Sequence, residues 1–236
     1  MSTSKYKYDW IIFDADNTLF DFTACEKAAL KGALENLGVY FQDSHHDVYH
    51  IINKSCWHDF ETGRITRAEL RLRRFELFFA EIGLKEDLEA FAVDYLGLLA
   101  GGTILLPGAE ALLNSLHGEF GLALATNGLK EVQRPRLVKS GLTSFFKVIV
   151  VSDEIGHAKP DAGFFDHAFH EMGRPDPGRV LMVGDNLNAD ILGSMSYGID
   201  ACWFNPDRLQ PYLDIEPDYQ IHDLSEVLKL VNSAER

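Results

Sequence analysis

The first part of the chain changes from one short apolar run to a long stretch with helical spacing. Residues 9–13 form an apolar run that stops at an acidic, turn-forming segment, which is typical of a buried strand in a parallel sheet. From residue 22 to residue 99, apolar side chains recur three and four positions apart, as at Leu30, Ala33 and Leu34, and glycines follow several of these runs. No segment in this part has a clear strand pattern. The pattern therefore predicts a helical bundle after the first strand.

After Pro107 the pattern alternates between short apolar runs and amphipathic stretches. Such alternation implies βαβ units and a parallel sheet covered by helices on both faces. The strand at 9–13 is expected to join this sheet. We therefore predict an α/β fold with a Rossmann-like parallel-sheet core, residues 1–20 and 103–236, and an inserted helical domain, residues 21–102. Later strands are predicted at 122–125, 148–151, 180–183 and 199–204, and helices at 130–140, 162–172, 189–197 and 224–231.

Composition narrows the class of protein. The 236 residues carry a formal net charge of −14, and a field of this sign repels nucleic acid polymers and anionic membranes. No apolar run approaches the ~20 residues that a membrane-spanning helix needs, and residues 1–8 lack an apolar signal region. The scattered cysteines at 25, 56 and 202 argue against a disulfide framework. We expect a cytoplasmic protein, a monomer or homodimer, with neither a nucleic acid nor a membrane as partner.

Acidic and polar side chains follow the predicted strands, where each strand ends. In a parallel sheet these ends lie at one edge, which is where ligands bind. Carboxylates crowded there repel each other, because two charges ~4 Å apart cost about 4 kcal/mol at an effective dielectric constant near 20. A hard divalent cation with oxygen ligands offsets this cost, and Mg²⁺ fits best. The residues expected at this edge are Asp14, Asp16, Thr126, Asn127, Lys159, Asp185 and Asp190.

The order of these residues resembles the four motifs of the haloacid dehalogenase superfamily. The motifs are DxDxT at 14–18, a threonine at 126, a lysine at 159 and a GD…D pattern from 184 to 190. The resemblance spans about residues 8–204. It implies a phosphatase in which Asp14 is the nucleophile that forms an aspartyl-phosphate, and Asp16 is the general acid and then the general base.

The same resemblance implies the remaining roles at this site. Mg²⁺ is expected to bind the Asp14 carboxylate, the backbone carbonyl of Asp16 and the Asp185 carboxylate. The phosphoryl oxygens are expected to be held by Thr126, Asn127 and Lys159. Asp190 is expected to orient Lys159 or the waters of the metal.

The helical block indicates the branch of the superfamily. The dehalogenases of the superfamily lack the second aspartate of the DxD motif, so the presence of Asp16 disfavours dehalogenation. The block resembles the cap that closes over the site in many members, and residues 53–66 resemble the cap of the bacterial pyrimidine 5′-nucleotidases, which share the DADxTLF opening of residues 14–20. The implied substrate is a small phosphate ester, a nucleoside monophosphate such as UMP, dUMP or dTMP. Lys54, Trp57 and Arg64 are candidate contacts to the nucleoside, and Trp57 has the alternative of a core position in the bundle.

Two other functions remain open on the sequence. One is a phosphatase for another small molecule, such as phosphoglycolate or a sugar phosphate. The other is a catalytically silent binding protein, against which the complete set of motifs argues.

The histidines of the helical block suggest a different site. His46 and His50 are spaced i, i+4, which suits a metal ion on a helix. The sequence shows no third ligand at a suitable spacing nearby, so we predict that His45, His46 and His50 are solvated surface residues.

Overall fold

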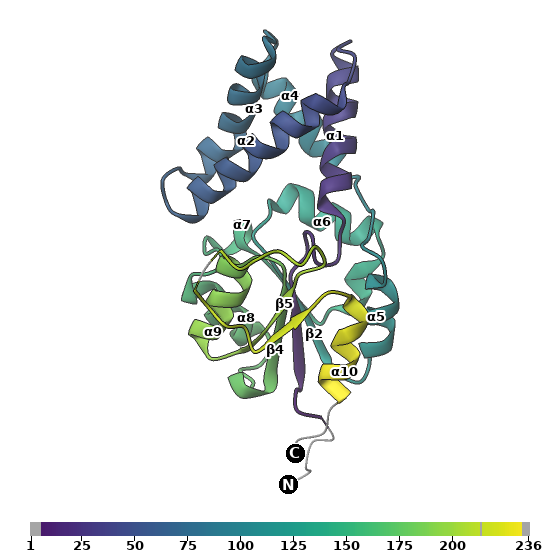
Figure 1. The fold of residues 1–236 in the computed structure, drawn as a ribbon, viewed down its shortest axis with the longest axis vertical. Helices are drawn as coiled ribbons and strands as arrows, with labels where there is room; N and C mark the ends of the chain where they lie inside the picture. Colours follow the sequence, from purple (N-terminus) through teal and green to yellow (C-terminus); the bar gives the residue numbers. More distant parts are fainter. Residues whose placement is uncertain (1–5, 213, 233–236) are drawn as a thin grey trace.

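Six parallel strands form one sheet in the order β3-β2-β1-β4-β5-β6 (Figure 1). The structure is a computed structural model that describes residues 6–212 and 214–232. The predicted α/β fold with a parallel-sheet core is confirmed. The opening strand lies in the middle of the sheet, between β2 and β4, which both come much later in the chain. The strands are β1 (Trp10–Phe13), β2 (Gly121–Thr126), β3 (Val148–Val151), β4 (Val180–Gly184), β5 (Asp200–Phe204) and β6 (Tyr219–Ile221).

Alternate side chains of each strand enter two different cores, because successive residues of a strand point to opposite faces of the sheet. In β1, Ile11 and Phe13 pack in the same cluster as Leu113, while Ile12 packs in a second cluster with Phe165. The first cluster lies under helices α5 (Ala109–Leu116) and α10 (Val227–Asn232), and the second lies under α8 (Ala162–Glu171). Burial on both faces explains why the strands are continuous apolar runs.

Several elements differ from the predicted pattern. The stretch predicted as one helix at 189–197 is a π-helical turn, η3, followed by the short helix α9, and β6 was not predicted because this edge strand has only 3 residues.

Among the helices of the described residues, none combines the length and the apolar composition that a membrane span requires. The remaining helices are α1 (Phe22–Asn36), α2 (Asp43–Glu61), α3 (Arg67–Ile82), α4 (Leu88–Leu99), α6 (Lys130–Lys139), α7 (Ser152–Ile155) and α9 (Gly193–Tyr197), with single turns η1 (Leu142–Phe145), η2 (Pro177–Arg179), η3 (Leu187–Leu192) and η4 (Leu224–Glu226).

Helices α1 to α4 form a bundle with its own aromatic core above the strand ends (Figure 1). Tyr49 stacks on Phe75 at a ring-centroid distance of 5.6 Å and meets Tyr95 edge-on at 5.3 Å. Leu129 and Val132, at the start of α6, belong to the same cluster, so the bundle rests on α6. We call this bundle the cap. The division into residues 21–102 and a two-part core stays a prediction.

The two connections between cap and core run side by side. The backbone N–H of Asp21 donates to the carbonyl of Ile104 at 3.0 Å, and Phe20 forms an antiparallel bridge with Leu105. The two chain connections between cap and core therefore lie at one place, next to the carboxyl end of β1, while ion pairs of Arg67 and Arg71 with Asp153 join the two parts elsewhere.

Candidate active site

Asp14 follows directly after β1 and is held at the edge of the sheet by the backbone. Its N–H donates to the carbonyl of Val183 on β4 at 2.9 Å. The chain then turns sharply, because Asn17 adopts a left-handed conformation (φ 58°) that asparagine tolerates better than most residues, and the N–H of Leu19 donates to Ala15 O at 3.0 Å. This turn keeps both Asp14 and Asp16 at the strand ends.

A buried lysine connects β2 with residues that follow β1 and β4. The Nζ atom of Lys159, a residue that is 1% exposed, donates to Asp14 Oδ1 at 2.7 Å, to Asp190 Oδ1 at 2.6 Å and to the carbonyl of Ala125 at 2.7 Å. All three ammonium hydrogens are thus used. Burial alone lowers the pKa of Lys159, but the carboxylates of Asp14 and Asp190 outweigh burial and raise it above the usual lysine value. Lys159 is therefore a fixed positive charge beside Asp14.

Three carboxylates crowd around this lysine. Oxygen atoms of Asp14, Asp185 and Asp190 lie within 4.8 Å of one another. Burial, together with the charges of Asp190 and Asp16, raises the pKa of Asp14 to about 7 against the lowering effect of Lys159. Burial, with Asp14 and Asp190, also raises the pKa of Asp185 well above the aspartate range. A single lysine thus does not balance the negative charge.

The donor set fits a hard divalent cation. The ligand atoms are carboxylate oxygens, which Mg²⁺ prefers, and burial with the neighbouring carboxylates raises the pKa of both Asp14 and Asp185, so a cation bound there would favour their charged forms. Both oxygens of Asp190 already accept hydrogen bonds, one from Lys159 Nζ and the other from the N–H of Asn186 at 3.0 Å. Asp14 and Asp185 are therefore better placed as ligands than Asp190.

The Asn127 side chain is committed to the backbone of Lys159. Its Oδ1 accepts from Lys159 N at 2.8 Å, and its Nδ2 donates to Lys159 O at 2.9 Å. The Asn127 amide thus positions the lysine, and a contact from Asn127 to a phosphoryl oxygen would come from its backbone N–H. Thr126, the last residue of β2, is buried, and its Oγ1 accepts from the N–H of Gly128 at 3.1 Å.

Asp16 is held by two residues of α6 that the sequence reasoning missed. Arg136 Nη1 donates to Asp16 Oδ1 at 2.6 Å, and Gln133 Nε2 donates to Asp16 Oδ2 at 2.5 Å. Arg136 is fully buried, lies over the ring of Phe20 at 4.3 Å, and also donates from Nε to Gly102 O at 2.9 Å. The sequence feature that could have indicated this contact is the i, i+3 spacing of Gln133 and Arg136 in the helix that follows Thr126.

The three cap residues predicted to contact substrate lie in different surroundings. Trp57 lines a small cavity together with Asp16. Arg64 is exposed and pairs with Asp59 at 2.8 Å, and Lys54 is exposed at the surface of α2. Of these three, Trp57 is the one that shares a cavity with a motif residue.

The last residue of α2, Glu61, brings a further carboxylate toward the site. Burial, together with the charge of Asp190, raises the pKa of Glu61 to about 7 against the lowering effect of Lys159. The cap therefore adds to the negative field at the strand ends.

The prediction of solvated histidines is wrong for His46. His46 is 7% exposed, and its Nε2 lies 3.2 Å from Oε2 of Glu26, a fully buried carboxylate on α1. His50 Nδ1 lies 2.7 Å from the same oxygen, and this hydrogen bond raises the pKa of His50. Asn53 Nδ2 donates to the other oxygen of Glu26 at 2.7 Å. Glu26 is thus a third group at metal-ligand distance from the two histidines. It lies on a different helix, so the spacing of residues along the sequence could not reveal it.

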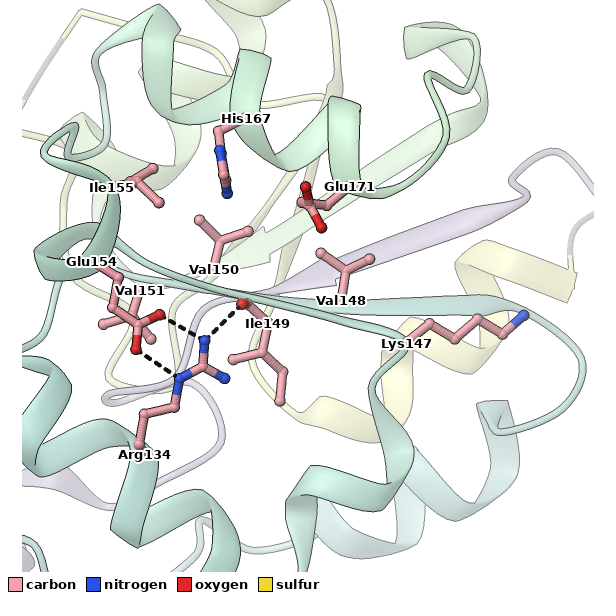
Figure 2. Close-up of a pocket in the computed structure, with 10 residues that line it drawn as sticks. All are labelled: Arg134, Lys147, Val148, Ile149, Val150, Val151, Glu154, Ile155, His167 and Glu171. Carbon is pink, nitrogen blue, oxygen red and sulfur yellow. Dashed lines mark hydrogen bonds and ion pairs between the residues drawn. The ribbon is translucent and has the colours of Figure 1, made fainter.

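A larger cavity lies away from these motifs, along the outer edge strand β3 (Figure 2). It has a volume of about 360 Å³, and an ion pair between Arg134 Nη2 and Glu154 Oε2 at 2.6 Å lies at its side. Its lining includes none of the residues predicted for the active site.

Known proteins are similar to this chain in sequence. The sequence profile of the haloacid dehalogenase-like hydrolases matches residues 8–194. The pyrimidine 5′-nucleotidase YjjG of Escherichia coli K12 is 36% identical over 95% of this chain and 98% of its own length. The pyrimidine 5′-nucleotidase PynA of Streptococcus pneumoniae is 35% identical over 94% of both chains.

A solved structure gives the same result for the fold. This structure is the magnesium-bound crystal form of the HAD-hydrolase YfnB of Bacillus subtilis, for which interdomain movement is described. It superimposes on this chain with a TM-score of 0.91 at 35% identity, and the match covers 96% of this chain and 99% of YfnB. The resemblance inferred from the motifs is confirmed. The chain belongs to the family of haloacid dehalogenase-like hydrolases.

Proposed function

We propose that this hydrolase is a Mg²⁺-dependent phosphatase that cleaves pyrimidine nucleoside 5′-monophosphates through an aspartyl-phosphate on Asp14. The observation that carries the proposal is the position of Lys159 Nζ, 2.7 Å from Asp14 Oδ1 and 2.6 Å from Asp190 Oδ1, with Asp185 in the same carboxylate cluster. This geometry supports the proposal, because a carboxylate, a buried cation and further carboxylate oxygens lie together at one edge of the sheet. Phosphoryl transfer needs these parts.

In the first half of the reaction, a carboxylate oxygen of Asp14 forms a bond to phosphorus while the bond from phosphorus to the leaving oxygen breaks. Asp16 transfers its proton to that oxygen. Both oxygens of Asp16 accept hydrogen bonds, from Arg136 and Gln133, so we expect one of these bonds to open when Asp16 carries a proton.

In the second half, water attacks phosphorus and gives its proton to Asp16. The bond between phosphorus and Asp14 breaks, phosphate leaves, and both aspartates return to their starting state. We expect Lys159 and Thr126 to stabilise negative charge on the phosphoryl oxygens, and a direct hydrogen bond from Lys159 requires that one of its three present bonds opens.

Asp14, Asp185 and the backbone carbonyl of Asp16 would hold Mg²⁺, which when bound supplies positive charge to the anionic substrate. The raised pKa values of Asp14 and Asp185 support a cation at this place. The choice of substrate is supported by the two relatives that are named pyrimidine 5′-nucleotidases and that match almost the whole chain.

A phosphate-release assay tests the proposal. The substrates are UMP, dUMP, dTMP, ribose 5-phosphate and phosphoglycolate, each with Mg²⁺ and with EDTA. We expect the three nucleotides to have the highest kcat/KM and EDTA to abolish turnover. Preference for phosphoglycolate or ribose 5-phosphate would leave a phosphatase of another substrate class, and no turnover of any ester would overturn the proposal.

A further inference from the structure

A cavity between cap and core lies next to Asp16, on the side where the leaving group departs in the proposed reaction. The core contributes Asp16, Gly128 and Gln133, and the cap contributes Trp57 and Arg74. The rest of the wall is apolar and consists of Phe22, Leu96, Leu99, Leu129 and Val132. An apolar slot with few polar groups suits a flat organic ring.

Arg74, on α3, is a buried cation with two unused donors. It is 2% exposed, and its Nη1 donates to Asn53 Oδ1 at 3.0 Å. Its Nε and Nη2 atoms are buried and have no hydrogen-bond partner within the described residues. Buried polar groups are almost always paired in native proteins, so an arginine in this state at a cavity indicates a ligand acceptor.

The surroundings of Arg74 fix the orientation of its guanidinium plane. The group lies 4.8 Å from the ring centroid of Phe75 and 5.7 Å from that of Tyr95. Asn53, which accepts from Nη1, also donates to the buried carboxylate of Glu26 at 2.7 Å. The positive charge is therefore balanced indirectly, through an amide, and the edge of the guanidinium that carries Nε and Nη2 has no hydrogen-bond partner among the described residues.

The two unused donors lie on the same edge of the guanidinium. The N–H of Nε and one N–H of Nη2 point in parallel, a fork that matches one carbonyl oxygen or two adjacent acceptors in a plane. The slot already contains the Asp16 carboxylate, and Glu26 lies behind Asn53. Asp16 is paired with Arg136 in this slot, and the choice of a neutral carbonyl as the partner of Arg74 follows from the substrates of the proposed function.

We infer that Arg74 and Trp57 form the leaving-group subsite, in which the fork of Arg74 binds the ring carbonyl O2 that the pyrimidine bases share. This inference rests on the proposed function and names the group that this site recognises. The cavity measures about 20 Å³ here, which is too small for a pyrimidine ring, so cap and core must separate for the base to enter. Trp57 then provides an aromatic face beside the ring.

The test compares UMP with ribose 5-phosphate, which has the same sugar phosphate and no base. The variant Arg74→Lys keeps the charge and loses the fork, and Arg73→Lys makes the same change at the exposed neighbouring position. We expect Arg74→Lys to lower kcat/KM for UMP about 10- to 100-fold, to change kcat/KM for ribose 5-phosphate less than about twofold, and to leave the circular dichroism spectrum intact. Arg73→Lys should change neither value.

Other outcomes separate the inference from the proposed function. If the wild type prefers UMP and Arg74→Lys retains that preference, the inference fails and the nucleotidase stands. Equal losses of kcat/KM on both substrates would make Arg74 a structural residue. A preference for phosphoglycolate that Arg74→Lys removes would mean that the fork binds a carboxylate. Either result overturns the inference that Arg74 binds a ring carbonyl.

A binding experiment is independent of turnover. Uridine, which carries the base without phosphate, is titrated into wild type and Arg74→Lys by calorimetry. We expect the dissociation constant to rise at least about 10-fold in the variant. Equal affinities would refute the subsite even if no ester is hydrolysed.

Discussion

Replacing Lys159 by methionine should destabilise the protein strongly, and more so at high pH. The side chain has almost the same length, but the ammonium that contacts Asp14, Asp190 and the carbonyl of Ala125 is lost. Removing one partner of a buried ion pair costs about 3–5 kcal/mol, because a charge stays buried without compensation. Folded domains have a total stability of about 5–15 kcal/mol, so the variant should lose a large part of it.

The pH dependence follows from the sign of the carboxylate shifts. The pKa of Asp14 is already raised to about 7 with Lys159 present, and without Lys159 it must rise further. A carboxylate with a raised folded-state pKa binds its proton more tightly when folded than when unfolded, so stability falls as pH rises above the unfolded value. The gap between wild type and Lys159→Met should therefore be small near pH 5 and grow through pH 8.

The assay is urea unfolding in EDTA at pH 5.5 and pH 8.5, followed by tryptophan fluorescence and circular dichroism. The double variant Lys159→Met/Asp190→Asn is the matched control, because it removes one of the two carboxylates that face the lysine. We expect the double variant to be more stable than Lys159→Met at pH 8.5. If Lys159→Met loses less than about 1 kcal/mol of unfolding free energy at pH 8.5, or loses the same amount at both pH values, the reasoning is refuted.

Three further predictions concern the metal, the nucleophile and the cap. Asp14→Asn should keep its fold, because Lys159 still pairs with Asp190, and lose at least about 10⁴-fold in kcat for phosphate release; substantial turnover would exclude Asp14 as nucleophile. Mg²⁺ at about 100 times its dissociation constant should raise the midpoint of the wild type by roughly 5–10 °C, and Asp185→Asn should abolish this shift; an unchanged shift would remove Asp185 from the ligand set. The hydrogen bond to Glu26 raises the pKa of His50, so its stabilising effect is full below the unfolded value near 6.5 and is lost as pH rises through the folded value. The difference in urea midpoint between wild type and His50→Gln should thus be larger at pH 6 than at pH 9, and a constant difference would contradict this assignment.

The sequence by itself determined the sheet and the residues at its edge. Strands that are buried on both faces must be short apolar runs, and right-handed parallel connections bring all their carboxyl ends to one edge. Asp14, Thr126, Lys159 and Asp185 follow such runs, so their convergence could be inferred from one chain without coordinates. The edge strand β6 could not be predicted in this way, because it has 3 residues and no apolar run.

Only the tertiary structure decided which buried polar groups meet across elements. Arg136 reaches Asp16 from 120 positions away, Glu26 reaches His46 from a different helix, and two buried donors of Arg74 have no partner among the described residues. Periodicity indicates which face of a helix is buried, but it carries no information about what lies opposite that face. A buried charge finds its partner through the packing angle and register of two elements, and these are set by the whole core together.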